Sequence, residues 1–521
     1  MTTKVLNPKT SLSIIGAAGI VSNADRRVLI IGQNLSGTAV DGALTENINS
    51  MTVAQINTLF GRGSLVAEMI RRGRDVLSTI ATQPQIDVIS LPDAGAAVQA
   101  SAVITITGAA TEAGVLSFSI GSKADYTFDI AVADTDTPTI IGDALVAAIT
   151  ADLDAPFTAA NVTGAVTITA KNGGTIPNTW GIAYSGTVAG VVVTLTTEWS
   201  NGATDPVLTS VFDGIADLRE TTIIWPGAYG MATLATELDS RFNVADAVLD
   251  GVGISVIADT ATNLKSAVSA LNSQSVVVFG NTYDVAGGFL NKKGPGIQEF
   301  SDIIATEIGI IRALRLTENA PITQFVNAGG SPSDAFGGVH ISSKPYHNTV
   351  LPGISVPDPG EYFDQTEQAD LLTNGISLFG ANRASNAVIL GTVVTTYLTD
   401  TAGNSDTSFK YLNTVDQTSA IREFYVSNLL SRYSQSRLTD GAISAGFAIE
   451  NEDSIRGFCI QLFQELSADL IVQSGNVALK DYKDNLSVVV DVGAGSVTIN
   501  QAPLLVGQVR SIIGTIQVNF G

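Results

Sequence analysis

Short, mostly apolar segments alternate along this chain with stretches of helical periodicity, and this alternation constrains the fold most. The segments read RRVLIIGQ (26–33), IDVISLPD (86–93), TTII (221–224), GISVIAD (253–259) and SVVVFGN (275–281). Near-continuous apolar runs of this length are typical of strands that are covered on both faces of a sheet. Strands that alternate with helices usually pair in parallel, because the helix carries the chain back to the same end of the sheet. The sequence therefore predicts an α/β domain with a parallel sheet.

Glycines and apolar spacing set the helices that we expect in this domain. The stretch TVAQINTLFGRGSLVAEMIRRGRD (52–75) reads as two helices separated at residues 61–63. Further helices are expected around LATELDSRF (234–242) and TNLKSAVSALN (262–272). A longer helix is expected over residues 296–316, where apolar residues recur three and four positions apart. Each helix neighbours one of the apolar strands, as an α/β architecture requires.

A segment of different composition interrupts the α/β pattern. Between residues 95 and 204 the chain is rich in Thr, Ala, Gly and Val, and Lys and Arg are scarce. Apolar and polar residues alternate there with a period of two, as in residues 103–132, around one helical stretch at residues 139–152. The sequence therefore predicts a small β-rich domain with one helix. Because the α/β pattern resumes afterwards, we interpret this domain as an insertion.

The last third of the chain is expected to form a separate α+β unit. NAVILGTVVTTYLTD (386–400) and SFKYLNTVD (408–416) read as strands on either side of the turn cluster TAGNSD. Residues 417–437 read as a long amphipathic helix. The segment LSVVVDV, the turn GAGS and the segment VTIN read as a β-hairpin over residues 486–500.

Both ends of the chain carry strand-like patterns without a neighbouring strand to pair with. In RSIIGTIQVNFG (510–521) the apolar side chains of one face are Ile512, Ile516, Val518 and Phe520. Near the other end, SLSIIGAAGIV (11–21) loosely imitates a secretory signal, but two glycines interrupt it and it reads better as an extended arm. A lone strand with an apolar face gains pairing and burial only by adding to the edge of another sheet.

Composition indicates an acidic protein that buries part of its surface in an assembly. Of the 521 residues 45% are hydrophobic and 15% are charged, and the mean hydropathy of +0.29 is high for a chain in which no apolar run approaches the length of a membrane helix. Surface that is poor in charge is typically covered by other chains. The net charge of −22 argues against nucleic acid and anionic lipid as partners. The single cysteine, Cys459, excludes an internal disulfide framework and, among apolar neighbours, indicates a buried structural thiol.

Signatures of catalysis and of cofactor or metal binding are missing from the sequence. The two histidines, His340 and His347, stand in a loop without an HExxH motif or a Cys/His cluster, and neither a GxSxG elbow nor a GxxxxGK[ST] phosphate loop occurs. The segment KNGGTIPNTWGI reads as a turn in which Gly173 and Gly174 supply positive φ, in preference to an anion-binding loop. No catalytic, cofactor-binding or metal site is expected, and an enzyme with a motif-free site is the remaining alternative.

Two basic clusters stand out in this acidic chain. RRGR (71–74) ends a predicted helix, where cations complement the helix dipole. Arg422, Arg432 and Arg437 lie along the predicted C-terminal helix. Such residues usually form a solvated face with local salt bridges. In an acidic oligomer they are also suited to contact acidic patches of a neighbouring subunit or of a partner.

The order of these segments resembles the tail sheath proteins of contractile bacteriophages, in particular their Mu-like branch. The likeness lies in RRVLIIGQNLSGTA with LFGRGSLVAEMIRRG, in the β-rich segment 114–159 with VTITAKNGGTIPNTWGI, and in QADLLTNGISLFG, TTYLTD and YLNTVDQTSAIREF. The resemblance spans most of the chain, and the chain departs from it most in the histidine loop, residues 332–362.

Together with the residue patterns, the resemblance implies a multidomain protein of mixed α/β and α+β class. The expected parts are an N-terminal arm (1–22), an α/β domain (23–94 with 206–370), an inserted β-rich domain (95–205), a C-terminal sheath core (371–509) that contains the hairpin 486–500, and a C-terminal arm (510–521).

The resemblance also implies that the arms reach into adjacent subunits and complete a small sheet beside each hairpin. The residues expected at these contacts are Leu12, Ile14, Ile15, Val488, Val490, Val497, Ile499, Ile512, Ile516, Val518 and Phe520, and Arg422, Arg432 and Arg437 are candidate contacts to the tube or to a neighbour.

By this resemblance the chain is a structural subunit of a virion and not an enzyme. It would be assembled in the host bacterial cytoplasm as a helical homo-oligomer of stacked hexameric rings around a tail tube protein, with baseplate and tail-terminator proteins as further partners. Contraction would drive the tube through the host envelope, without a cofactor, direct nucleic-acid contact or stable membrane insertion. The alternatives are the sheath of a phage-derived contractile injection particle and, from a different class, a secreted surface or adhesin protein.

Overall fold

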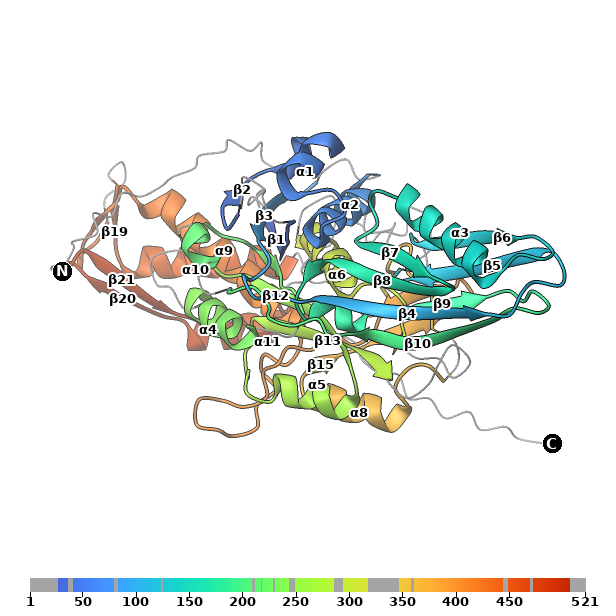
Figure 1. The fold of residues 1–521 in the computed structure, drawn as a ribbon. Helices are drawn as coiled ribbons and strands as arrows, with labels where there is room; N and C mark the ends of the chain where they lie inside the picture. Colours follow the sequence, from blue (N-terminus) through green and yellow to red (C-terminus); the bar gives the residue numbers. More distant parts are fainter. Residues whose placement is uncertain are drawn as a thin grey trace, which may run out of the picture.

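A parallel sheet lies in the middle of an elongated molecule, with a β-rich part at one end and a helical part with a hairpin at the other (Figure 1). The computed structural model describes residues 27–35, 41–78, 83–122, 125–208, 211–216, 218–227, 230–242, 249–284, 294–316, 346–357, 360–443, 448–468 and 472–506. The protein therefore has several parts of mixed helix and sheet, as the sequence predicted.

All five apolar segments form strands of one central sheet, and all five pair in parallel, which confirms the prediction of a parallel sheet. The five strands are β1 (Arg27–Gln33), β3 (Gln85–Leu91), β11 (Thr222–Ile224), β12 (Val252–Asp259) and β13 (Val276–Asp284). Their order is β13-β12-β11-β1-β3, so the chain first adds a strand on one side of β1 and later builds the other side. Short strands β2 (Leu44–Thr45), β14 (Gly294–Pro295) and β15 (Ile376–Ser377) complete the sheet.

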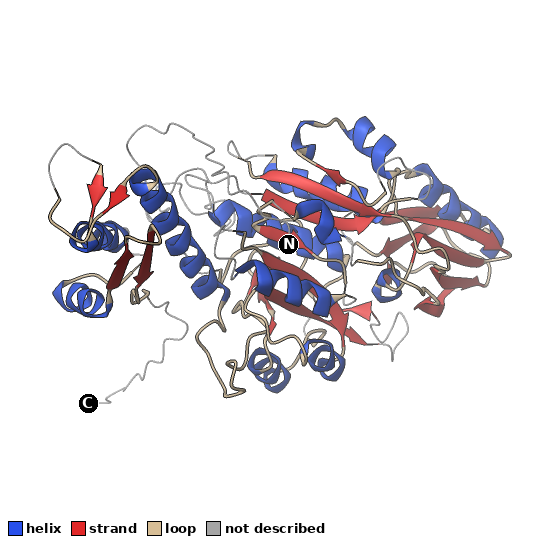
Figure 2. Ribbon diagram, turned by 90° about the vertical axis from the view of Figure 1, so that its left-hand side faces the viewer, coloured by secondary structure: helices blue, strands red, loops and turns tan. Residues whose placement is uncertain are grey.

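Helices cover both faces of this sheet (Figure 2). Helices α2 (Leu65–Leu77) and α6 (Ser301–Leu316) pack on one face, and α4 (Met231–Phe242), α5 (Ala261–Val268) and α8 (Gln365–Thr373) pack on the other. Successive residues of β1 alternate between the two cores: Val28 and Ile30 face the α2 side, and Leu29 and Ile31 face the α4 side. This two-sided burial is why the strands read as apolar without a polar alternation.

The two helices predicted before β3 form where the sequence placed them. Helix α1 (Val53–Phe60) begins with a capping box between Thr52 and Gln55, and α2 begins at the N-cap Ser64. Gly61 and Gly63 separate them with φ of 84° and 75°, a backbone conformation that residues with a Cβ rarely adopt. A 3-10 turn, η1 (Ile48–Ser50), precedes α1.

The chain leaves the parallel sheet after β3 and returns to it at β11, and the residues between build two antiparallel sheets. The four-stranded sheet has the order β10-β4-β8-β7, and the three-stranded sheet has the order β6-β5-β9. The elements are β4 (Gln99–Thr107), β5 (Gly114–Ile120), β6 (Thr127–Val132), α3 (Pro138–Ala151), β7 (Phe157–Val162), β8 (Ala165–Gly173), η2 (Ile176–Thr179), β9 (Ile182–Ser185) and β10 (Val192–Ser200), followed by η3 (Val211–Ile215). The one predicted helix is α3, and its residues Ile141, Leu145 and Ile149 are buried.

The chain from Ile421 onward forms a helical unit with its own core, whereas residues 376–415 pack in the two cores of the central sheet. Helices α9 (Leu412–Tyr433), α10 (Glu452–Ala468) and α11 (Asn476–Asn485) pack with the hairpin β20 (Ser487–Asp491) and β21 (Ser496–Asn500). Two further strand pairs are β16 (Phe379–Asn382) with β17 (Ala387–Leu390), and β18 (Arg437–Leu438) with β19 (Ile449–Glu450). Cys459 is fully buried in this core, as predicted.

Two strand predictions in this last third are wrong. SFKYLNTVD does not form a strand, because α9 already begins at Leu412, and Tyr411 makes only an isolated bridge to Val394. Leu412 and Val415 are both buried at a helical spacing, and this packing outweighs the short alternation before them. Of residues 386–400 only β17 forms a regular strand. The strand ends before Gly391, whose N–H donates to the carbonyl of Leu378 at 2.9 Å.

Two helix boundaries also differ from the prediction. The helix expected over 296–316 begins at Ser301, because the side chain of Asn281 bonds both the N–H and the carbonyl of Ile297, each at 3.0 Å, and holds that residue outside the helix. The helix expected over 417–437 is α9, which starts five residues earlier and ends at Tyr433.

Candidate assembly surface

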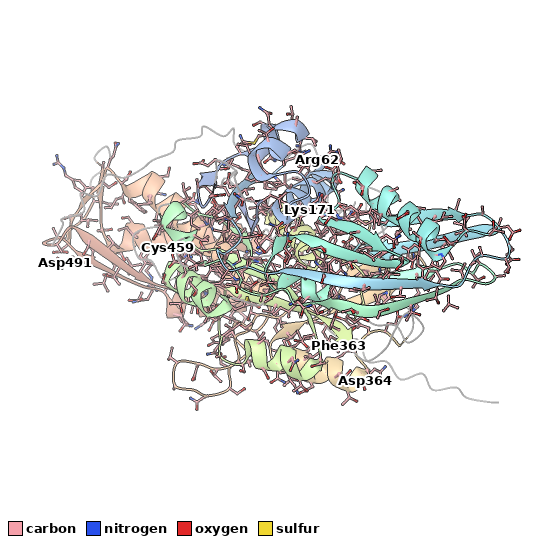
Figure 3. The ribbon with its side chains drawn as sticks, viewed as in Figure 1. Arg62, Lys171, Phe363, Asp364, Cys459 and Asp491 are labelled. Carbon is pink, nitrogen blue, oxygen red and sulfur yellow. The ribbon has the colours of Figure 1, made fainter. Side chains whose placement is uncertain are left out.

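The predicted hairpin is present and presents one apolar and one exposed face. Val488 pairs with Ile499 and Val490 pairs with Val497, so these four side chains share the face that packs on the core of the helical unit. Val489, which points to the opposite face, is 55% exposed. The carboxylate of Asp491 accepts a hydrogen bond from the N–H of Ala494 at 2.8 Å and closes the turn (Figure 3).

Both outer edges of the hairpin are open within the described part of the chain. Strands β20 and β21 form a sheet of only two strands, so each has one paired and one unpaired edge among the described residues. A row of unpaired N–H and C=O groups is a template on which a further strand can add. The hairpin can therefore accept a further strand at either edge.

Helices α10 and α11 hold the hairpin in place. Arg456 on α10 donates to the carbonyls of Lys483 and Leu486, both at 2.6 Å, at the point where α11 ends and β20 begins. The hydroxyls of Tyr425 and Tyr482 lie 2.9 Å apart, and the ring of Tyr482 stacks on Phe463 with centroids 4.2 Å apart. Sequence reasoning missed Arg456, since nothing in its local pattern distinguishes it from a solvated arginine.

The chain returns across the base of the hairpin after β21. The hydroxyl of Tyr482 donates to Gln501 at 2.7 Å, and the N–H of Gln473 donates to the carbonyl of Leu504 at 2.7 Å. The expected arm residues Leu12, Ile14, Ile15, Ile512, Ile516, Val518 and Phe520 all lie outside the described residues, so their pairing stays a prediction.

The three arginines that the sequence placed along the C-terminal helix differ in their surroundings, and Arg437 lies beyond the end of α9. Arg422 is engaged within the chain: it pairs with Asp250 at 3.0 Å and lies over the ring of Phe242 at 4.7 Å. Arg432 is exposed and lies over the ring of Phe458 at 4.2 Å. Arg437 is exposed at the start of β18. Arg432 and Arg437 can therefore still meet a partner, whereas Arg422 serves the junction between α9 and the central sheet.

Ion pairs join α9 to the central sheet. Arg219 pairs with Glu423 at 2.8 Å and with Asp250 at 3.1 Å, and Arg312 on α6 pairs with Asp416 at 2.7 Å. Burial disfavours a charged Asp250, but the guanidiniums of Arg219 and Arg422 hold the pKa of its carboxyl below the usual range. The first turns of α9 thereby belong to the central part of the molecule, and its later turns belong to the unit that carries the hairpin.

The basic cluster at the end of α2 is not a solvated face. Arg72 is 8% exposed and pairs with Glu307 at 2.8 Å and with Glu299 at 3.1 Å. Glu299 also accepts a hydrogen bond at 2.8 Å from the hydroxyl of Ser122, which belongs to the β-rich part. Burial raises the pKa of Glu299 to about 7 and raises the pKa of Glu307 well above its usual value. The sequence pattern missed this network because its members lie far apart in the chain.

The segment KNGG serves as an internal connection. Gly174 has the predicted positive φ, at 109°, whereas Gly173 is the last residue of β8 and does not. The side chain of Asn172 accepts a hydrogen bond from the N–H of Leu65 at 3.1 Å and donates to Asp93 at 3.0 Å. These contacts fill the carboxyl ends of β1 and β3, where open α/β sheets commonly bind ligands.

Clusters of residues suited to catalysis or to metal binding are sparse in the part of the chain that the structure describes. No group of three or more His, Cys, Asp or Glu among these residues is arranged to hold a metal ion. His347 is exposed, and His340 lies outside the described residues. Burial raises the pKa of the Cys459 thiol to about 11, which disfavours the reactive thiolate. None of the described helices is long and apolar enough to span a bilayer.

Comparison with known proteins identifies one informative relative. The chain is 26% identical over 449 residues to the Mu-like prophage FluMu tail sheath protein of Haemophilus influenzae, an alignment that covers 84% of this chain and 82% of that protein. The resemblance to Mu-like tail sheath proteins is thereby confirmed. No family model matches the sequence.

Two solved structures match the chain at low similarity. One is the sheath tail protein Lin1278 from Listeria innocua, with a TM-score of 0.45 and 11% identity, where 94% of each chain is covered. The other is the sheath of an extracellular contractile injection system, PVC, in the contracted state, with a TM-score of 0.40 and 9% identity over 99% of this chain and 98% of that one.

Proposed function

We propose that this chain is a structural subunit of a contractile phage tail sheath and that it carries out no catalysis. The observation that carries the proposal is the relationship to a Mu-like prophage tail sheath protein over 84% of the chain. The hairpin with two open edges supports it, because that hairpin is a ready acceptor for strands of other copies. The proposal includes the sheath of a phage-derived particle, since the same subunit contacts serve both.

In the proposed assembly, residues 510–521 of one copy and the N-terminal arm of another add to the open edges of the hairpin. About five ladder hydrogen bonds of about 1 kcal/mol each, with burial of Ile516, Val518 and Phe520 at roughly 1.5–3 kcal/mol each, favour the contact. Ordering the arm opposes about half of this gain. The remainder is enough to tether neighbours while weaker contacts between folded parts change.

Such a contact is heterologous, because the arm and the hairpin that receives it are different surfaces. Heterologous contacts that do not close into a ring generate helical tubes. We place a tail tube protein inside this sheath and baseplate and terminator proteins at its ends. Repacking of the folded parts between two lattices, while the arms stay paired, would shorten the tube and drive the inner tube through an envelope.

Electron microscopy of the purified chain tests the proposal. The full chain should form striated hollow tubes, and a chain that ends at residue 509 should remain monomeric. The matched control is the full chain with Thr236→Ala, a change on the exposed face of α4 that should leave tubes intact. Normal tubes from the truncated chain would refute the tether, and a full chain that never forms tubes would refute the function.

A further inference from the structure

One face of the four-stranded sheet β10-β4-β8-β7 points outward without a charged side chain in its three central cross-strand rows. The middle row is formed by Thr197, Val103, Thr167 and Ala160, which are aligned by the strand register and are exposed or half-buried. The rows on either side of it consist of Ser, Thr, Ala and Val. The opposite face, with Ile104 and Ile168, is buried under α3 and the second sheet.

This face carries fewer charges than the composition of the chain would give on average. With 15% of all residues charged, a dozen positions would include about two charges. None of the 49 Asp and Glu residues is a paired member of these rows, and Glu198 of β10 lies half-buried in the register shift between Thr197 and Ser200. Small side chains also keep the face flat, and Thr105 and Thr196 bond to each other through their hydroxyls at 2.5 Å.

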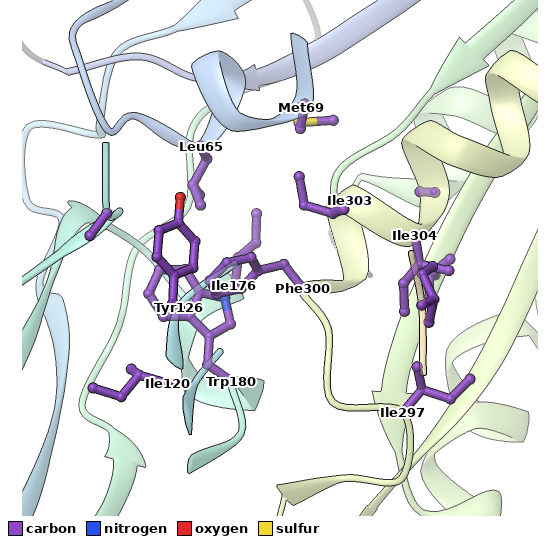
Figure 4. Close-up of a cluster of buried hydrophobic side chains, with 14 of the residues drawn as sticks. Leu65, Met69, Ile120, Tyr126, Ile176, Trp180, Ile297, Phe300, Ile303 and Ile304 are labelled. Atoms are coloured by element: carbon purple, nitrogen blue, oxygen red, sulfur yellow. The ribbon is translucent and has the colours of Figure 1, made fainter. Parts of the chain in front are cut away.

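The sheet is also mounted rigidly on the central part of the molecule. Asp93, just after β3, accepts hydrogen bonds from Gln33 at 2.9 Å and from the N–H of Gly173 at 2.7 Å. Trp180 packs against Phe300 with ring centroids 4.6 Å apart, in a cluster that joins the β-rich part to the start of α6 (Figure 4). A fixed orientation matters for an interface, because little freedom is lost when the partner binds.

We propose that this outward face, defined by the three rows around Thr167, is a contact surface for a second copy of this chain. Two copies that each carry a net charge of −22 repel one another over most of their surface. They can approach most closely where few carboxylates have to be desolvated, and the paired positions of this face hold none. Nucleic acid or anionic lipid would require cations, which the three rows lack, and a sugar would be expected to require an aromatic platform, which they also lack.

The inference rests on the proposed sheath function and adds a contact to it. The tether through the hairpin lies at the other end of the elongated molecule (Figure 1). A second, weaker contact near the β-rich end would let neighbours separate or slide there while the tether holds. Because a polar tube lacks twofold axes between neighbouring subunits, the face meets a different surface of the second copy.

Thiol labelling tests the contact directly. The only native cysteine, Cys459, is 0% exposed, so the labelling measured is that of the introduced cysteine. In Thr167→Cys the new thiol should react quickly with a maleimide in the dissociated protein and at least roughly tenfold more slowly in tubes. A contact worth only about 1.4 kcal/mol is enough to give tenfold protection. Equal rates in tubes and in dissociated protein would overturn the inference and leave the sheath function standing. Absence of tubes from the unmodified chain would overturn both.

A pair of charge substitutions gives an independent measurement. Thr105→Glu with Thr167→Glu should lower the urea concentration at which tubes dissociate. The control, Thr236→Glu with Thr373→Glu, adds the same charge on exposed faces of α4 and α8 and should shift it much less. Equal shifts for both variants would contradict the proposed contact. Intact monomer folding is checked by circular dichroism, so that a misfolded variant is not mistaken for a lost interface.

Discussion

Replacement of Arg72 by methionine tests how much the buried ion pairs between α2 and α6, with the segment that leads into α6, contribute to stability. Arg72 is 8% exposed and is the shared partner of Glu299 and Glu307. Removal of one partner from a buried pair typically costs about 3–5 kcal/mol, because the remaining charge stays buried without a counter-charge. We therefore expect Arg72→Met to lower the free energy of unfolding by about that amount near pH 8.

The matched control is Arg62→Met. Arg62 pairs with Asp154 of the β-rich part at 2.6 Å, but its side chain is 46% exposed. Exposed pairs contribute about 0–1 kcal/mol, so this variant should be close to the unmodified protein. The contrast between the two variants isolates the effect of burial from the effect of an ion pair as such.

Urea unfolding followed by tryptophan fluorescence measures both variants. Trp180 and Trp199 lie in the β-rich part and are each 2% exposed, so a change in their fluorescence reports that this part has become exposed to solvent. The loss in Arg72→Met should be smaller at pH 5, where Glu299 and Glu307 can take up protons and no longer need a cation. Adding Glu307→Leu should recover part of the stability, since an apolar replacement of a buried pair is often neutral. Equal losses in Arg72→Met and Arg62→Met, or a loss that is the same at both pH values, would refute this reasoning.

Two further outcomes are expected. The pKa of Glu299 is raised to about 7 from 4.5, so the folded state binds more protons than the unfolded state between these values, and stability should fall as pH rises through this range by roughly 3 kcal/mol for this group. Urea midpoints between pH 4.5 and 8 should therefore decline in the unmodified protein and decline less in Glu299→Gln. In the hairpin, Val488→Ala should destabilise the C-terminal unit by about 2 kcal/mol, because Val488 is 2% exposed. Val489→Ala, on the exposed face, should change stability by less than about 0.5 kcal/mol; equal effects in thermal unfolding would contradict the assigned faces.

Local patterns predicted most of the regular elements. The apolar strands, the break at Gly61 and Gly63, helix α3 and the terminal hairpin follow from residues that are close in sequence. The strand predicted at SFKYLNTVD failed because five residues of alternation are compatible with either a strand or a helix end. There the packing of Leu412 and Val415 decided for the helix.

The candidate site was only partly predictable. The hairpin and its inward residues Val488, Val490, Val497 and Ile499 could be found from alternation alone. Arg456, which holds the hairpin to α10 and α11, could not, because its partners are the carbonyls of Lys483 and Leu486, about thirty residues away. Backbone acceptors leave no signature in a sequence.

By itself the sequence determined most of the strands and helices and which of their faces are apolar, and it predicts strand-like arms at the ends, which lie outside the described residues. These properties depend on the spacing of side chains along the chain, which periodicity reports directly. Only the tertiary structure decided that Arg72 is buried among carboxylates, that Asn172 fills the ends of β1 and β3, and that an uncharged sheet face points outward. These properties depend on which distant segments meet. The free energy of such contacts is set by burial and by the local dielectric environment, and neither can be read from a short stretch of sequence.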